Sequence, residues 1–93
     1  DRFSHRDILN LLEAQEGCCK GCFTPFSEVA YEVDHKIPLE LGGSNSPANL
    51  QLLCCSCNKS KGAEDNDVWL SSLRTRQVLE YLEELEEELS YGD

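Results

Sequence analysis

Apolar residues recur at helical spacing near the start of the chain, and we expect a helix over about 5–16. Three of them share one face: Ile8, Leu11 and Leu12. Ser4 followed by Asp7 has the form of a capping box with Ser4 as the N-cap, and Gly17 would end the helix. The pattern predicts a helix that serves packing.

Alternation of apolar and polar residues then predicts a short strand that runs into Asp34 and His35. The residues that alternate are Val29, Ala30, Tyr31, Glu32 and Val33. Pro38 prevents the strand from continuing as a central strand. Residues 50–53 form a second apolar run, which we interpret as a strand from its length and position, since periodicity alone does not separate it from a helix.

Two helices are expected after residue 57. Residues 58–61 open a short helix that Gly62 ends, and a long helix follows over about 67–90, capped by Asp65 or Asn66. Its apolar stripe comprises Leu70, Leu73, Val78, Leu82, Leu85 and Leu89. A run of glutamates occupies the opposite face. A solvated face is the simpler interpretation of this run, and a partner surface is the alternative.

Composition indicates a small intracellular domain that needs an additional stabilising element. A chain of 93 residues suits one domain with a modest core, and its six cysteines suit disulfides in a secreted protein or a metal in an intracellular one. There is no signal peptide, transmembrane run or lipidation motif, which favours a cytoplasmic location. Because the chain contains no methionine, we expect it to be excised from a larger protein.

The net charge of −10 argues against strong non-specific DNA affinity for this fragment alone. Its distribution matters more than its total. Most of the charge comes from the last residues, where no basic residue is present: Glu80, Glu83, Glu84, Glu86, Glu87, Glu88 and Asp93. The remainder of the chain is only mildly acidic.

Two pairs of cysteines have the spacing of zinc knuckles, in which two thiolates reach one ion from a tight turn. The pairs are Cys19 with Cys22 and Cys54 with Cys57, separated by residues 23–53. They predict a structural zinc site with four thiolate ligands, in which Gly21 allows the backbone to turn. Cys18 and Cys55 are left over as spare thiols, and disulfide bonding is the alternative.

Residues between the two knuckles and just after the second have the chemistry of phosphodiester hydrolysis. His35 suits a general base that takes a proton from water, and Asp34, Asn49 and Asn58 offer oxygen atoms of the kind that hold Mg²⁺. An Asp-His pair alone is weak evidence, since a histidine after a strand is most often only hydrogen-bonded. His5 has no partner at metal-ligand spacing, so we interpret it as an exposed polar residue.

The order and spacing of these residues resemble the HNH endonuclease family. The resemblance covers about 19–62 and is carried by four segments: VDHKIP at 33–38, GG at 42–43, NLQLLC at 49–54 and CNKSKG at 57–62. It implies the α+β ββα-metal (His-Me finger) fold as the core of a single domain over 1–93, with a four-cysteine structural zinc. An N-terminal helix and a long C-terminal helix flank this core.

The resemblance also implies a role for each motif residue. His35 corresponds to the general base, Asp34 and Asn58 to ligands of a catalytic Mg²⁺ or Mn²⁺, and Asn49 to the residue that ties the loop to the hairpin and orients the histidine. The implied structural zinc ligands are Cys19, Cys22, Cys54 and Cys57. Candidate phosphate contacts are Lys36, Lys59 and Lys61, each of which is equally well an ordinary surface lysine.

The leading hypothesis is a metal-dependent endonuclease domain that hydrolyses DNA, delivered to its substrate by the rest of a larger nuclease or defence protein. The family occurs in homing and restriction enzymes, in phage packaging and in defence effectors. The alternative is a catalytically inactive, zinc-stabilised module that binds nucleic acid or protein. A third hypothesis is a disulfide-rich structural domain, which would stay folded under chelation. Asp34, His35 and Asn58 favour the enzyme, since a scaffold would need none of them.

Overall fold

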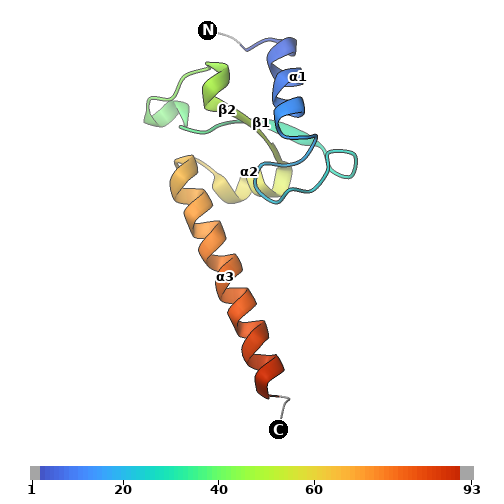
Figure 1. Ribbon diagram of the computed structural model, residues 1–93. Coiled ribbons are helices and arrows are strands. Elements are labelled where there is room, and N and C mark those ends of the chain that lie inside the picture. The colour runs from blue at the N-terminus through green and yellow to red at the C-terminus, as the bar shows by residue number, and fades with distance from the viewer. Residues whose placement is uncertain (1–2, 91–93) are drawn as a thin grey trace.

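The computed structural model describes residues 3–90 as a mixed α+β fold (Figure 1). A two-stranded antiparallel sheet is combined with three helices, which confirms the predicted fold class. In chain order the elements are α1 (His5–Ala14), β1 (Tyr31–His35), η1 (Leu39–Leu41), η2 (Pro47–Asn49), β2 (Leu50–Cys54), α2 (Cys55–Lys61) and α3 (Asn66–Ser90).

Helix α1 begins with the predicted capping box. The Ser4 hydroxyl accepts a hydrogen bond from the Asp7 N–H at 3.2 Å, and the Asp7 carboxylate accepts one from the Ser4 N–H at 2.7 Å. The helix ends two residues earlier than expected, because Gln15 already takes the C-cap position and Gly17 adopts a left-handed φ of 69°.

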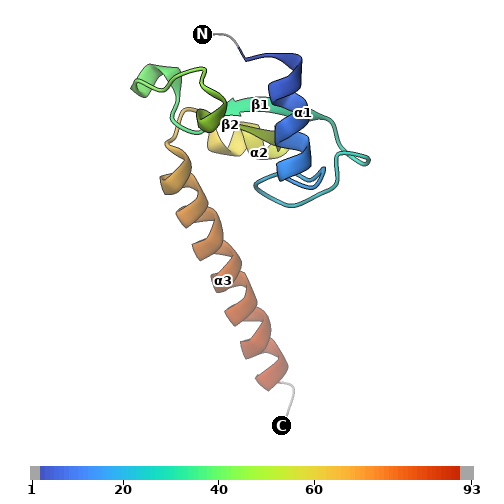
Figure 2. The ribbon, with the colours of Figure 1, turned by 45° about the horizontal axis from the view of Figure 1, so that its top comes forward.

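The two strands form a hairpin in which His35 pairs with Leu50, and Tyr31 pairs with Cys54. All five residues of β2 are buried, because α1 packs on one side of the hairpin and α2 on the other (Figures 1 and 2). Burial on both faces explains why leucines occupy both faces of β2 instead of alternating regularly with polar residues. The short helix α2 starts directly after β2 at Cys55, three residues before the position expected from sequence.

The side chain of Gln15 joins the end of α1 to the middle of β2. Its Oε1 accepts from the Leu52 N–H at 2.9 Å, and its Nε2 donates to the Leu52 carbonyl at 3.0 Å. Nε2 also donates to the Cys18 carbonyl at 2.8 Å. The Gln15 amide therefore bonds to the N–H and C=O of Leu52 in the way that a neighbouring strand would, and so satisfies these buried backbone groups.

The main core lies between the knuckles and the start of α3. Its buried members are Cys19, Leu53, Cys54, Cys57 and Trp69, with Phe26, Val29, Leu70 and Leu73 packed around them. Trp69 is only 3% exposed, and its indole N–H donates to the Ser60 hydroxyl at 3.2 Å. The first turns of α3 are thereby fixed to α2.

Beyond its first turns α3 projects away from the rest of the fold, which gives the molecule an extent of 61 × 30 × 18 Å (Figures 1 and 2). The Asp65 carboxylate accepts from the Asp67 N–H at 3.1 Å, so Asp65 is the capping residue of the two proposed. Within residues 3–90, no helix has both the length and the apolar character needed to cross a membrane.

Candidate functional site

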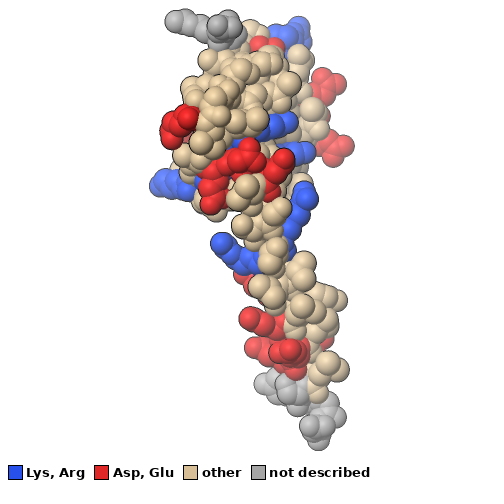
Figure 3. Space-filling view, turned by 90° about the vertical axis from the view of Figure 1, so that its left-hand side faces the viewer, with Lys and Arg blue, Asp and Glu red and all other residues tan. Residues whose placement is uncertain are grey.

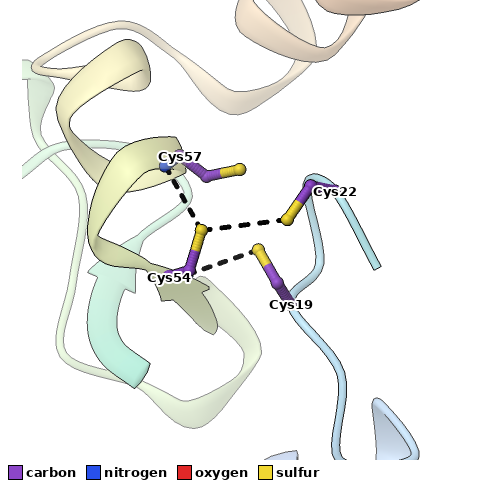
Figure 4. Close-up of side chains that lie close together, drawn as sticks. All are labelled: Cys19, Cys22, Cys54 and Cys57. Atoms are coloured by element: carbon purple, nitrogen blue, oxygen red, sulfur yellow. Dashed lines mark hydrogen bonds between the residues drawn. The ribbon is translucent and has the colours of Figure 1, made fainter. Parts of the chain in front are cut away.

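Four thiols converge where the two knuckles meet (Figure 4). The sulfur atoms of Cys19, Cys22, Cys54 and Cys57 all lie within 4.8 Å of one another. The Cys22 and Cys54 sulfurs are 3.8 Å apart, close to the separation of about 3.8 Å that a tetrahedral zinc ion with Zn–S bonds of about 2.3 Å requires. The donor set and its spacing therefore fit zinc, as the sequence predicted.

Backbone N–H groups support these thiols. The Cys54 N–H donates to the Cys19 sulfur at 3.3 Å, and the Cys57 N–H donates to the Cys54 sulfur at 3.5 Å (Figure 4). The Gly21 N–H donates to the Cys19 sulfur at 3.4 Å. Such donors favour the negatively charged thiolate that zinc binding needs.

The pKa values of Cys22, Cys54 and Cys57 are shifted in different directions. Burial raises the pKa of Cys57, and the neighbouring thiols raise it further; burial likewise raises the pKa of Cys54. Burial also acts to raise the pKa of Cys22, but hydrogen bonds with Thr24 and with the thiols of Cys19 and Cys57 outweigh it and lower the pKa to about 6. Cys22 therefore ionises more readily than Cys54 or Cys57.

Gly21 is required because no side chain fits at this position, rather than because the backbone has a positive φ. Its φ is not among the positive values, but a Cβ here would lie 2.7 Å from the Trp69 ring and 2.9 Å from the Cys57 sulfur. The residue thus lets the first knuckle approach α2 and α3. The two spare thiols stay outside the cluster: Cys18 is half-buried near the Glu16 carbonyl, and Cys55 is exposed.

The loop after β1 is closed by Asn49. Its Oδ1 accepts from the Ile37 N–H at 2.9 Å, while its Nδ2 donates to the carbonyls of Ile37 at 3.0 Å and Ser44 at 2.8 Å. Gly43 lies so close to the backbone of Ile37 that a Cβ at this position would overlap the Ile37 carbonyl oxygen. Asn49 therefore holds together the two ends of the loop that follows His35.

His35 lies at the end of β1, half-buried, beside that loop. Its Nε2 is 2.6 Å from Oδ1 of Asn45. With an amide oxygen facing Nε2, the neutral ring carries its proton on Nε2, which leaves Nδ1 as the basic atom. Asn45 was not singled out from the sequence, because nothing in the spacing of a polar loop predicts which residue folds back onto the histidine.

Asp34 faces α2 and is buried. Its Oδ2 lies 3.1 Å from the ammonium of Lys61 and accepts from Gln51 Nε2 at 2.9 Å, while its Oδ1 accepts from Lys61 at 3.3 Å. Lys61 also donates to the His35 carbonyl at 2.9 Å. Lys61 is thus neither the candidate phosphate contact nor the ordinary surface lysine expected from sequence, because its side chain is 0% exposed and paired with Asp34.

Asn58 lies one turn before Lys61 on α2. Its Nδ2 donates to Glu32 Oε1 at 2.7 Å, so its own oxygen is left for another partner. Glu32 and Asp34 are two residues apart on β1 and project from the same face of the strand. Sequence reasoning missed Glu32, although this alternation placed it on the Asp34 face.

The structure places the predicted residues on β1 and α2 without bonding them to one another. Within residues 3–90, no hydrogen bond links the side chains of Asp34, His35 and Asn58 directly. Asp34 bonds to Lys61 and Gln51, His35 to Asn45, and Asn58 to Glu32. Lys59 is exposed and Lys36 is half-buried, so both remain accessible. His5 is exposed at the start of α1.

Comparison with known proteins supports this assignment of the segment. The model of the HNH endonuclease family matches residues 19–64, which contain both knuckles, the hairpin, the loop and α2. No curated protein matches the chain. The match begins at the first zinc-type cysteine and agrees with the segment that carried the resemblance in the sequence. Residues 19–64 of this chain therefore belong to the HNH endonuclease family.

Proposed function

We propose that the chain is the nuclease domain of a metal-dependent endonuclease that hydrolyses DNA phosphodiester bonds. The observation that carries the proposal is the placement of His35 at the end of β1, in a segment of the HNH endonuclease family. Asn45 fixes the ring on one side, and the loop beyond it is closed by Asn49. In this arrangement Nδ1 of His35 is the atom that takes the proton from the attacking water.

Asp34 and Asn58 are the residues that would hold a catalytic Mg²⁺ or Mn²⁺. Their chemistry fits a hard cation, since both offer oxygen atoms. A carboxylate accepts about four bonds, and the contacts of Asp34 with Gln51 and Lys61 leave acceptor capacity on Oδ1. When bound, such a cation stabilises negative charge on the phosphate and on the leaving oxygen.

The remaining side chains of the site position these groups. Lys61 fixes the Asp34 carboxylate and the His35 carbonyl at once, so it holds the end of β1 against α2. The hydrogen bond from Asn58 to Glu32 orients the Asn58 oxygen away from Glu32. Lys36 and Lys59 would contact the phosphate backbone. We place this activity inside the cell, where reducing conditions keep the four thiols available for zinc.

The first test is cleavage of supercoiled plasmid by the zinc-loaded protein with Mg²⁺ or Mn²⁺ at low salt. His35→Ala should lower the nicking rate by at least about 100-fold, the usual contribution of a general base, with unchanged zinc content and circular dichroism. His5→Ala is the matched control, because His5 is the other histidine of the chain, and it should cleave as wild type does. Nicking by His35→Ala above a hundredth of the wild-type rate would refute the general-base role.

A second comparison separates a metal-ligand role of Asp34 from a structural one. Asp34→Ala alone leaves the Lys61 ammonium buried without its partner, which should destabilise the fold by about 3–5 kcal/mol. The double variant Asp34→Ala with Lys61→Met removes that unpaired charge. If the double variant folds and binds zinc but does not nick DNA, whereas Lys61→Met alone still nicks it, Asp34 acts in the reaction. Recovery of nicking in the double variant would assign Asp34 a purely structural role.

The main competitor is a zinc-stabilised binding module without catalysis. The ion pair between Lys61 and Asp34 is the observation that favours it, because the ammonium already neutralises the carboxylate. Under that alternative, wild type and His35→Ala bind plasmid equally and neither nicks it. Gel-shift measurements beside the nicking assay distinguish the two functions.

A further inference from the structure

An apolar stripe runs along the projecting part of α3, away from the core. Val78, Leu82 and Leu89 are 56%, 48% and 77% exposed, and Leu85 is half-buried among them. At about 100° of rotation per residue, the stripe lies about 140° around the helix from the face that packs on the core. That core-facing side consists of Trp69, Leu70 and Leu73. The stripe is therefore a second apolar face with no partner within residues 3–90. Leu70 and Leu73 do not belong to it, which differs from the single stripe expected from the sequence.

The spacing of this stripe is that of a helix pair. Val78, Leu82, Leu85 and Leu89 alternate steps of four and three residues, as the inner positions of a coiled coil do. Leu79 and Tyr81 widen the stripe on either side and are 55% and 58% exposed. A helix that projects alone into water gains little stability from propensity, since most helical stability comes from packing. The spacing of the stripe therefore predicts that a second helix packs against it.

Charge is divided between the two halves of α3. Arg74 and Arg76 are exposed near the core, whereas the acidic residues from Glu80 to Glu88 occupy the far half. Figure 3 shows the same division, with basic atoms where the helix leaves the core and acidic atoms toward its far end. A parallel pair of such helices would place the acidic halves side by side. An antiparallel pair would place each acidic half beside a basic one.

We infer that α3 pairs antiparallel with α3 of a second copy of this chain, with Val78 of one copy packed against Leu82 of the other. Arg74, Tyr81 and Glu88 recur every seven residues along one edge of the stripe. Antiparallel pairing brings this edge of one helix against the same edge of the other. Arg74 then faces Glu88 of the second copy twice in each dimer, and the two Tyr81 side chains meet at the centre.

The two cores do not obstruct this arrangement. Each core contacts α3 through residues about 140° around the helix from the stripe. The core lies at the first turns of α3, and the rest of the helix projects beyond it (Figure 1). The far half of one α3 therefore reaches the exposed side of the other helix near Ser71 and Thr75, which are both exposed. The dimer would carry one core at each end of the helix pair.

Light scattering coupled to size-exclusion chromatography tests the proposal on the zinc-loaded protein. Wild type at micromolar concentration should have twice the mass of one chain, and Leu82→Glu should be monomeric. Both residues have high helix propensity, so this change preserves the helix. Leu39→Glu is the matched control, because Leu39 is a similarly exposed leucine outside α3, and it should stay dimeric. A monomeric wild type, or a dimeric Leu82→Glu, would overturn the inference.

Charge exchange tests the orientation. Arg74→Glu and Glu88→Arg should each weaken the homodimer at least tenfold, since each variant places like charges together at both ends of the pair. An equimolar mixture of the two variants should restore the dimer, because every Arg74 position then faces an opposite charge. In a parallel pair Arg74 would instead face Leu79, so mixing would restore nothing, and that result would exclude the antiparallel arrangement.

Discussion

At the scale of single residues, one amide holds two elements together. Gln15 makes three hydrogen bonds from the end of α1, two of them to the backbone of Leu52 in the buried strand β2. Gln15→Ala removes all three and leaves the Leu52 N–H without its partner in a site closed to water. We expect the free energy of unfolding of the zinc-loaded protein to fall by about 2–3 kcal/mol, measured by urea denaturation at fixed zinc concentration.

The same substitution at an exposed glutamine provides the comparison. Gln77 lies on the solvent side of α3, so Gln77→Ala should change the free energy of unfolding by less than about 0.5 kcal/mol. Equal effects of the two variants would show that the amide of Gln15 contributes nothing specific.

Residue-level prediction from sequence succeeded where a motif fixes the spacing and failed where the contact depends on the folded loop. The four clustered cysteines followed from their spacing, and the resemblance singled out Asn49, whose side chain bonds to Ile37 and Ser44. Asn45 against His35, and Gln15 against Leu52, join residues whose separation follows no local rule. Lys61 was misplaced at the surface, because a lysine is almost never fully buried unless an acid pairs with it.

At the scale of elements, the contact between the first knuckle and α3 depends on the absence of a Cβ at Gly21. A Cβ at Gly21 would approach the Trp69 ring to 2.7 Å and the Cys57 sulfur to 2.9 Å. Gly21→Ala should therefore displace Cys57 or Trp69 and lower the free energy of unfolding by about 1–3 kcal/mol. Visible absorption of the cobalt-substituted protein should change as well, since it reports the geometry of the four thiolates.

Gly17→Ala gives the contrast for this prediction. Nothing lies within 4 Å of a Cβ at Gly17, but its φ of 69° disfavours any side chain. The variant should lose about 1–2 kcal/mol from backbone strain and keep the cobalt spectrum of wild type. A normal spectrum in Gly21→Ala would mean that the knuckle tolerates the added methyl group.

Element boundaries show what local patterns can and cannot supply. The capping box placed the start of α1, and the apolar run placed β2. Helix α2 begins directly after β2, earlier than its polar sequence suggested, because the Cys54 sulfur accepts from the Cys57 N–H and so caps the helix. A thiol acting as an N-cap is not among the usual signals at a helix start.

At the scale of the whole molecule, the four-cysteine site forms part of the hydrophobic core. Three of the four thiols belong to the buried cluster that also contains Leu53 and Trp69. Removal of zinc should therefore unfold the hairpin rather than a peripheral loop, seen as loss of tertiary circular dichroism on chelation. A disulfide-linked domain would keep its structure under the same treatment.

Zinc binding should also be linked to pH. Where the chain is folded without metal, burial keeps the pKa values of Cys54 and Cys57 above their usual range, and in the unfolded chain a cysteine has its ordinary pKa of about 8.5, so both thiols are protonated at pH 7 in either state. The Cys22 pKa of about 6 leaves that thiol mostly ionised. Because zinc binds thiolates, binding must release the protons of Cys54 and Cys57, and the affinity for zinc should fall as the pH is lowered from 8 to 6. Calorimetry in buffers of different ionisation enthalpy counts the protons released.

The control for this linkage is Cys55→Ser, because Cys55 is exposed and lies outside the cluster. It should release as many protons as wild type, whereas Cys57→Ser should release fewer and bind zinc more weakly. A zinc affinity that does not change between pH 6 and 8 would contradict the linkage, since it would require all four thiols to be ionised before the metal arrives. In that case the four thiolates would repel one another in the metal-free protein, and the positive charge of zinc would be needed to bring them together in the core.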